Sequence, residues 1–217
     1  MSDHGLKKRF PSPAPSQQEV DAFVEASGKN DAKAVVSFLD KYADAVDRKN
    51  SSHGSTAMTH TAYAGKKEML ELLLARGASV DEKDKSGWTP SMYAAACGDK
   101  EFLLLLLDKG AHVEGTAGRD EWTLLMLAAA SENPETVELL IERGANLESK
   151  DCVGNTALDI ARKNEEPVTA KVIERHLVLQ KKERALAEIR TQEQAAARLE
   201  KLKNRRPPKS PLKKDRP

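Results

Sequence analysis

The chain has 217 residues, of which 39% are hydrophobic, 32% charged and only 4% aromatic. Its longest apolar run, residues 102–107, is far shorter than the about 20 residues that a membrane-spanning helix needs, which argues against such a helix. The net charge of +1 hides an asymmetry, because residues 198–217 sum to +7, residues 1–20 to +1 and the acidic remainder to −7.

Residues 1–16 are rich in Pro and Ser and contain no apolar run of signal-peptide length. We expect this segment to be disordered. Two scattered cysteines, Cys97 and Cys152, do not form a disulfide framework, which indicates a reducing compartment. We therefore expect a soluble cytoplasmic protein, and the basic C-terminus is also compatible with the nucleus.

Residues 17–50 carry two short apolar clusters on either side of a break at residues 28–31. The first cluster includes Val20 and Phe23, and the second includes Val35 and Leu39. This pattern predicts two short helices in a segment that is otherwise polar. A polar end is typical of the terminal unit of a repeat array, because one side of it faces water.

Four similar blocks follow, which open at Thr56, Thr89, Thr123 and Thr156 with spacings of 33, 34 and 33 residues. A Gly-Ala pair closes three of them, at residues 77–78, 110–111 and 144–145. Glycine ends helices readily because it adopts positive φ without a Cβ clash. A fixed period of about 20–50 residues indicates a stacked array.

The residues that carry the closest family likeness are Gly87-Trp88-Thr89-Pro90, followed by Ala94-Ala95 and Gly98. With these motifs the chain resembles an ankyrin-repeat protein, whose period is about 33 residues. The resemblance implies an all-α solenoid of helix–turn–helix–finger repeats, here with a long C-terminal helix and disordered tails. Its expected units are a degenerate capping repeat at 17–50 and repeats at 51–84, 85–118, 119–151 and 152–176, which together form an ankyrin domain over 17–176.

The chain departs from the family pattern at three places in the repeats. The family's proline is kept only at Pro90. Its histidine is replaced by Thr59, Met92, Met126 and Asp159, and the glycine between the two helices becomes Glu132 and Glu165 in the last two repeats.

Residues 168–203 contain no Gly and no Pro and are dense in strong helix formers, which predicts one long helix. Its first part, with Val168, Val172 and Ile173, is expected to cap the stack, and residues 177–204 to form an extended charged helix. Its later apolar positions make at best a weak heptad; they are Leu186, Ile189, Ala196, Leu199 and Leu202. Two interpretations stay open: a solvated charged helix, or a coiled-coil or partner-helix contact.

Residues 205–217 form a basic, Pro-rich tail for which several interpretations stay open. Arg205, Pro208, Pro211 and Lys213 resemble ligands of polyproline-binding domains. The Lys-rich run also resembles a nuclear-import or nucleic-acid patch, and the simplest alternative is a solvated disordered tail. The tail lacks interleaved aromatic residues, which argues against sequence-specific nucleic-acid recognition.

No catalytic motif stands out in the sequence. His53 and His60 lie close together without a third ligand at metal spacing, so we predict no metal site. Cys97 lies between Ala96 and Gly98 without a paired His, and we interpret it as a small buried hydrophobic residue. We predict a non-enzymatic protein without a cofactor.

The family resemblance implies that fingers and inner helices line a concave surface that binds a partner protein. The position before each conserved Thr holds Ser55, Trp88, Trp122 and Asn155. The two tryptophans either anchor a partner or lie flat over their own fingers, and we favour the first because Trp is enriched at binding hot spots. The other predicted partner-binding residues are Lys85, Ser86, Tyr63, Cys97, Ser131 and Val153.

The acidic body favours a partner of basic character. The alternative function is an electrostatic adaptor, in which the basic helix and tail bind nucleic acid or an anionic membrane surface. Steep loss of binding with salt would indicate the adaptor, because counterion release accompanies binding to phosphates.

Overall fold

The computed structural model describes residues 14–203, with side chains up to residue 200, and this part of the chain is mostly helical. The helices are α1 (Gln17–Gly28), α2 (Ala32–Lys41), α3 (Ala57–Tyr63), α4 (Lys67–Ala75), α5 (Pro90–Ala96), α6 (Lys100–Asp108), α7 (Leu124–Ala130), α8 (Pro134–Glu142), α9 (Ala157–Lys163) and α10 (Pro167–Lys203), with a 3₁₀ turn at Ala43–Ala45. The two short strands are β1 (Thr116–Ala117) and β2 (Trp122–Thr123). The predicted all-α repeat solenoid with a long C-terminal helix is confirmed.

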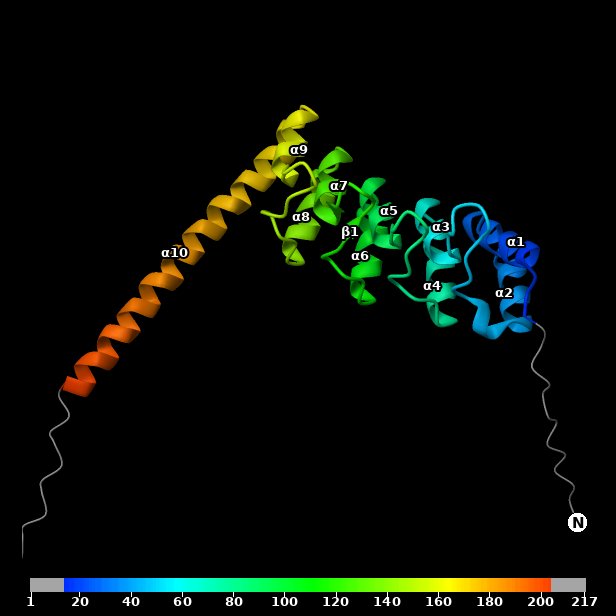
Figure 1. Ribbon diagram of the computed structural model, residues 1–217, viewed down its shortest axis with the longest axis horizontal. Coiled ribbons are helices and arrows are strands. Elements are labelled where there is room, and N and C mark those ends of the chain that lie inside the picture. Colours follow the sequence, from blue (N-terminus) through cyan, green and yellow to red (C-terminus); the bar gives the residue numbers. More distant parts are fainter. Residues whose placement is uncertain (1–13, 204–217) are drawn as a thin grey trace, which may run out of the picture. The chain divides into compact units, whose positions relative to one another are not determined.

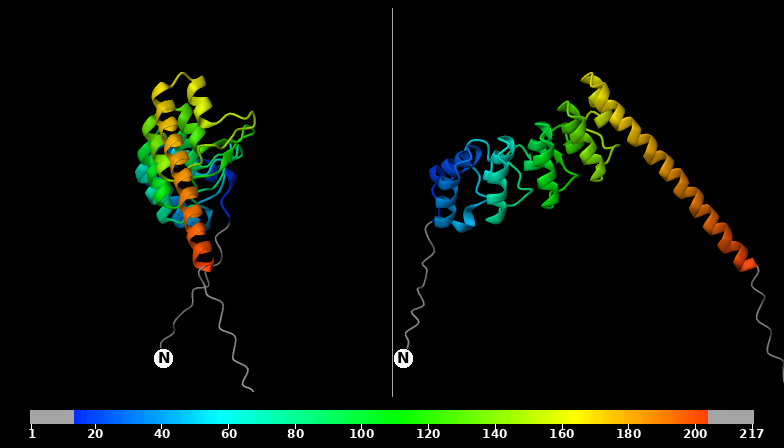
Figure 2. Two further views of the ribbon diagram at one scale, coloured as in Figure 1. Left: turned by 90° about the vertical axis from the view of Figure 1, so that its left-hand side faces the viewer. Right: turned by 180° about the vertical axis from the view of Figure 1, so that it is seen from behind.

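The described chain divides into two compact units, residues 14–174 and residues 175–203. In the first unit α1, α3, α5, α7 and α9 stack in sequence order, and α1, α3, α5 and α7 each pack against the helix that follows (Figure 1). The loops between repeats project from one side of these helix pairs (Figure 2, left). We call them fingers; they are residues 47–55, 81–88, 114–122 and 148–155. We call the surface formed by the fingers and by the last turns of α3, α5 and α7 the finger face.

The space between the helix layers is filled mainly by Leu, Met and Ala, in agreement with the low aromatic content of the chain. The largest side chains with under 2% exposure are Phe102, Met58, Met69, Leu70, Leu73, Met92, Leu103, Leu106, Leu124, Leu125, Met126 and Leu140. At the C-terminal end of the stack, Ile173 is fully buried, whereas Val168 is 58% exposed. The expectation that Val168 helps to cap the stack was therefore wrong, because this residue lies on the solvent side of α10.

Each of the four repeat threonines caps an inner helix. Their hydroxyl oxygens accept a hydrogen bond from the backbone amide three residues later, at 3.1–3.4 Å. The residue at that later position accepts in return from the Thr amide; these four residues are Thr59, Met92, Met126 and Asp159. The acceptor is an oxygen at 2.9 Å in the first and last repeats and a methionine sulfur at 3.5 Å in the middle two. The reciprocal cap is thus kept at all four positions that have lost the family's histidine.

The turn between the two helices of each repeat requires a residue in the left-handed conformation. Gly65 and Gly98 occupy this position in two repeats, with φ of 63° and 67°. Glu132 and Glu165 occupy it in the next two, with φ of 58° and 59°. A side chain with a Cβ pays a conformational penalty there, which explains why glycine is the usual residue.

We expect Glu132→Gly to raise the free energy of unfolding by about 0.5–1 kcal/mol, because it relieves this strain at an exposed position. Urea denaturation followed by circular dichroism measures the change. Glu132→Ala is the matched control, since alanine removes the carboxylate but keeps the Cβ. Equal stability of the Gly and Ala variants would show that a Cβ at position 132 causes no backbone strain.

Carboxylates connect the first three fingers to the repeat that follows each of them. Asp47 accepts from the amide of Ser79, Asp81 from that of His112, and Glu114 from that of Asn146. The three distances are 3.0, 3.1 and 2.6 Å. Every donor follows a Gly-Ala pair, so the same backbone group is satisfied in the same way in three successive repeats. We call this series the carboxylate ladder.

Candidate protein-binding surface

The position before each capping Thr has different surroundings in the four repeats. Ser55 is buried, with 8% exposure, whereas Trp88, Trp122 and Asn155 are half-buried. The tryptophans therefore do not stand free in solvent on their turns. What each one packs against decides what it can offer to a partner.

Trp88 belongs to an aromatic cluster with Tyr93 and Tyr63. The ring centroids of Trp88 and Tyr93 are 5.1 Å apart with an interplanar angle of 45°, and those of Tyr63 and Tyr93 are 5.9 Å apart at 80°. Tilted and edge-to-face arrangements at these distances are favourable for aromatic rings. The cluster joins a finger, α5 and the last residue of α3, and Tyr63 leaves 66% of its surface exposed. Two repeats thus combine to make one aromatic surface on the finger face.

Asp84 holds this cluster in place from the base of the finger. One of its carboxylate oxygens accepts from the amides of Ser86 at 2.8 Å and Trp88 at 2.9 Å, and the other accepts from the hydroxyl of Tyr93. Asp84 as a whole is 6% exposed. Burial, together with the hydrogen bond to Asp84 and its negative charge, raises the pKa of Tyr93, so this hydroxyl stays protonated and donates. Asp84 therefore fixes both the turn that carries Trp88 and the ring on which Trp88 lies.

The finger that carries Trp122 is built differently. It forms a two-stranded antiparallel ladder in which Ala117 pairs with Trp122 and Thr116 with Thr123. It contains one more residue than the Trp88 finger, and Glu121 takes a φ of 56°. Among the described residues, Trp122 has no aromatic contact. The two tryptophans share a repeat position but not an environment.

The last finger closes like the Trp88 finger but carries polar groups. One oxygen of Asp151 accepts from the amides of Val153 and Asn155, at 3.0 and 2.7 Å. Lys163 on α9 then donates to the side chain of Asn155 at 2.6 Å. Val153 is 78% exposed at the tip. The finger face therefore changes from aromatic to polar along the stack.

Lys85 connects the Trp88 finger to the preceding one. Its backbone amide donates to the carbonyl of His53 at 3.2 Å, and its ammonium group donates to the carbonyl of Ser51 at 2.9 Å. The predicted neighbour Ser86 is exposed beside it. Lys85 thus has a structural role in aligning the fingers, which the sequence interpretation did not anticipate.

Cys97 is exposed, and the interpretation of it as a buried residue was wrong. It is the C-terminal cap of α5, where the short helix ends and the backbone turns outward. Ser131 caps α7 at the equivalent place, and its hydroxyl donates to the carbonyl of Ala128 at 2.9 Å. Both predicted site residues therefore lie at ends of inner helices, on the finger face.

Both cysteines are expected to react with a thiol reagent in the native chain, and to react faster as the pH rises. Partial burial raises the pKa of both thiols, and the negative charge of Asp99 adds to this at Cys97 and that of three carboxylates at Cys152. The reactive thiolate is therefore scarcer at neutral pH than in a free cysteine. A colorimetric thiol titration without denaturant should count two thiols, and one in Cys97→Ser. Reaction of Cys97 only after unfolding would contradict its exposed position.

Among residues 14–200, no group of three or more His, Cys, Asp or Glu side chains is arranged to hold a metal ion. No helix in the described part of the chain is long and apolar enough to cross a membrane. The predicted tail motif of Arg205, Pro208, Pro211 and Lys213 lies outside the described residues.

The model of the family described as ankyrin repeats in three copies matches residues 23–117 and 112–176, which is more than half of the chain. The chain belongs to the ankyrin-repeat family. Ankyrin repeats are generally non-enzymatic modules of protein–protein interaction. The resemblance deduced from the repeat motifs is thereby confirmed.

Individual relatives match only a short part of the chain. Ankyrin repeat and KH domain-containing protein mask of Drosophila melanogaster is 39% identical over 59 residues, which is 27% of this chain and 1% of that protein. The human and mouse ankyrin repeat domain-containing protein 17 are each 40% identical over 45 residues, 21% of this chain and 2% of theirs. The chain thus matches one or two repeats of much longer proteins.

Proposed function

We propose that this ankyrin-repeat protein binds a partner protein through the finger face, with the aromatic cluster of Tyr63, Trp88 and Tyr93 as the main contact. The observation that carries the proposal is the placement of three aromatic rings from two adjacent repeats at one point, with Tyr63 66% exposed. Aromatic side chains supply large contact area at low entropic cost and dominate binding hot spots.

The rigidity of the cluster supports this role. Asp84 fixes the turn of Trp88 and the hydroxyl of Tyr93 before any partner arrives, so few rotamers remain to be ordered on binding. Tyr63 lies at the edge of this fixed platform. We expect Tyr63 and the exposed edge of Trp88 to contribute most of the affinity, and Cys97 and Ser131 to border the contact.

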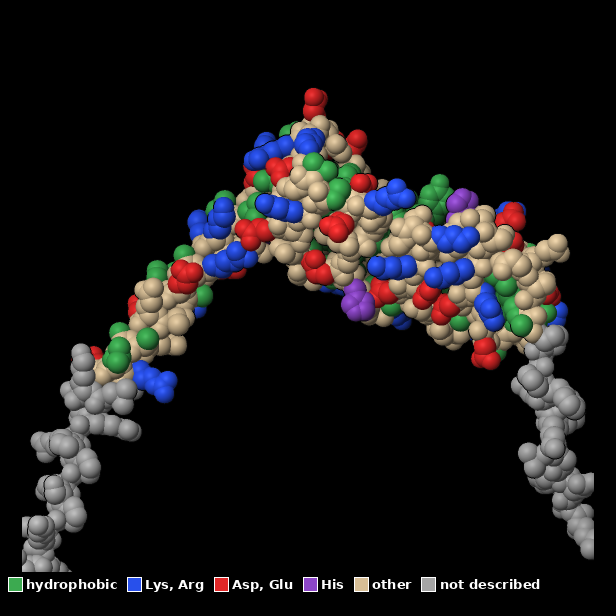
Figure 3. All heavy atoms as spheres, viewed as in Figure 1, with side chains coloured by type: hydrophobic (Ala, Val, Ile, Leu, Met, Phe, Trp, Pro, Cys, Tyr) green, Lys and Arg blue, Asp and Glu red, His purple; other side chains and the backbone are tan. Residues whose placement is uncertain are grey.

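Surroundings of mixed polarity complete the surface. On the face of the repeats seen in Figure 3, Lys and Arg side chains are interspersed with Asp and Glu, and hydrophobic side chains form only small separate patches. An aromatic contact with a polar border is typical of a specific and reversible interface. We propose that Trp122, Asn155 and Val153 extend this border along the stack, with Ser55, Lys85 and Ser86 shaping the fingers.

Affinity capture from a nuclease-treated native lysate, with mass spectrometry, tests the proposal. Tyr63→Ser removes an exposed ring at little cost to folding and is expected to deplete a discrete set of captured proteins. Val168→Ala is the matched control, since it trims an exposed apolar side chain of α10. Capture that is unchanged by Tyr63→Ser and by Trp88→Ala, but is lost at high salt, would instead support the electrostatic adaptor.

The cytoplasmic location is also a proposal. It predicts that a fluorescent fusion of the full chain is found in the cytoplasm. Entry into the nucleus that is lost on deleting residues 205–217 would identify the basic tail as an import signal.

A further inference from the structure

The second unit of the chain exposes a series of large apolar side chains to solvent. Val178, Leu179, Leu186, Ile189 and Leu199 lie on α10, each 47–59% exposed. Surface hydrophobic residues that are scattered singly need no explanation, but a series along one helix indicates a contact. Such a contact requires that the five side chains lie on one side of the helix and that a partner of matching chemistry packs against them.

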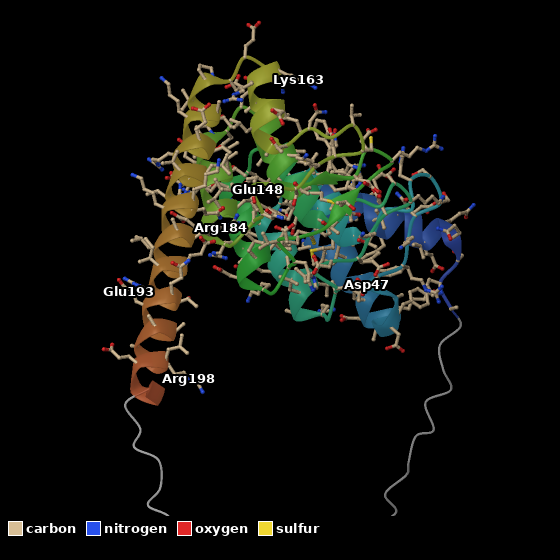
Figure 4. The ribbon with its side chains drawn as sticks, turned by 60° about the vertical axis from the view of Figure 1, so that its left-hand side comes forward. Asp47, Glu148, Lys163, Arg184, Glu193 and Arg198 are labelled. Atoms are coloured by element: carbon tan, nitrogen blue, oxygen red, sulfur yellow. The ribbon has the colours of Figure 1, made fainter. Side chains whose placement is uncertain are left out.

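The five side chains fall on one side of a heptad pattern, which a supercoiled helix follows with about 3.5 residues per turn. In a heptad with Leu179 and Leu186 at a positions, Ile189 falls at d, and Val178 and Leu199 fall at g. Figure 4 shows Glu193 and Arg198 projecting from opposite sides of the helix, as the a and f positions require. Among residues 175–200, every large exposed apolar residue therefore lies at an a, d or g position.

Two charged residues interrupt the apolar seam: Lys182 at a d position and Glu193 at an a position. None of the ion pairs found in the described part of the chain involves either of them. Charges at such positions weaken a coiled coil, but they also specify its register and orientation. The spacing of these two therefore limits which helix can pair with this face.

A second copy of the same helix, running antiparallel, matches every layer of this seam. In antiparallel pairs an a residue faces a d residue. When Leu186 faces Ile189 of the second copy, Lys182 faces Glu193, and Leu179 faces Ala196. In the flanking positions of the same register, Glu183 meets Arg190, and Val178 meets Leu199.

A parallel pair of the same helices would bring like charges together. Lys182 would then face its own copy, and so would Glu193. Juxtaposed like charges are strongly unfavourable in an interface and are a common means of rejecting a wrong pairing.

We propose that residues 178–199 of α10 pair with the same segment of a second copy of the chain, in an antiparallel dimer centred between Leu186 and Ile189. At 1.5 Å per residue the paired segment is about 33 Å long. The apolar layers supply the attraction, and the Lys182–Glu193 layers set the direction. This contact uses none of the residues of the finger face, and a dimer would contain two copies of the finger face.

Sedimentation equilibrium of the full chain tests the pairing. Lys182→Glu places two acidic residues in the same layer and is expected to weaken dimerisation about tenfold or more, and Glu193→Lys should do the same. The double variant Lys182→Glu/Glu193→Lys restores opposite charges and should restore the dimer. Arg198→Glu is the matched control, because it makes the same charge change at an outward f position and should have no effect.

Disulfide cross-linking in a Cys97→Ser/Cys152→Ser background tests the orientation. A mixture of Ala185→Cys and Gln192→Cys chains is expected to cross-link, because these g positions face each other in the antiparallel register, while neither variant should cross-link alone. Cross-linking of Ala185→Cys with itself would overturn the antiparallel arrangement. A chain that stays monomeric at all concentrations, or a double variant that fails to dimerise while keeping its helix content, would overturn the proposal.

Discussion

Replacing Phe102 by alanine is expected to lower the free energy of unfolding by about 3–5 kcal/mol. Phe102 is fully buried on α6, in the middle of the stack, and α6 packs against α5 and against the next outer helix α8. Its removal takes away the apolar contacts of a whole ring and leaves a cavity that helices on both sides can close only in part. Because each repeat is stabilised by its neighbours, we also expect the unfolding transition to broaden.

Urea denaturation followed by far-ultraviolet circular dichroism measures both effects. Leu104→Ala is the matched control, since Leu104 lies on the same helix but is only half-buried, and it is expected to cost roughly 1 kcal/mol. A loss for Phe102→Ala no larger than that of Leu104→Ala would show that the ring of Phe102 is only loosely packed.

Replacing Asp84 by alanine is expected to cost about 2–3 kcal/mol and to change the environment of Trp88. The variant leaves two finger amides and the hydroxyl of Tyr93 without their acceptor, so the turn loosens and the aromatic cluster loses its fixed geometry. Denaturation should report the loss of stability, and the tryptophan emission should shift to the red as Trp88 becomes more solvated.

Asp151→Ala provides the comparison. Asp151 accepts the equivalent amides in the last finger, but no tryptophan lies there. We expect it to destabilise the chain while leaving tryptophan emission unchanged. If Asp84→Ala changed the emission no more than Asp151→Ala does, Asp84 would not be what positions the aromatic cluster.

The repeat architecture could be predicted because it depends on local patterns. The spacing of the four capping threonines and the closing Gly-Ala pairs reports helix ends directly, and the absence of Gly and Pro after Pro167 marks the long α10. These signals come from backbone requirements, namely an N-terminal acceptor and a left-handed turn residue. Such signals therefore predict helix ends without any knowledge of tertiary contacts.

The aromatic cluster could be predicted only in part, because it is a contact between repeats. Trp88 and Tyr63 were expected in the site, but Tyr93 and Asp84 were missed. A signal for Asp84 does exist: Asp84 and Asp151 both stand three residues before a glycine and five before a capping Thr. Tyr93 is one turn into the helix after Thr89, and its side-chain direction depends on packing that no spacing reports.

Two residues that were predicted to be buried are exposed, and both errors have the same cause. Cys97 and Val168 were assigned to buried positions from their apolar character. Both lie at helix ends, where the side chain leaves the layer between helices. Apolar character alone says little about burial at such ends, because single exposed apolar residues are common in proteins.

The carboxylate ladder has a consequence for how such a chain can change its length. Each middle repeat carries both an amide donor for the preceding repeat and a carboxylate acceptor for the following one, as Ser79 and Asp81 do at the start of the Trp88 finger. A duplicated or deleted unit of about 33 residues therefore joins its new neighbours with every such bond remade. Genetic gain or loss of whole units is thus tolerated at these contacts, whereas a change of a few residues between one acceptor and its donor alters only the bond that spans it.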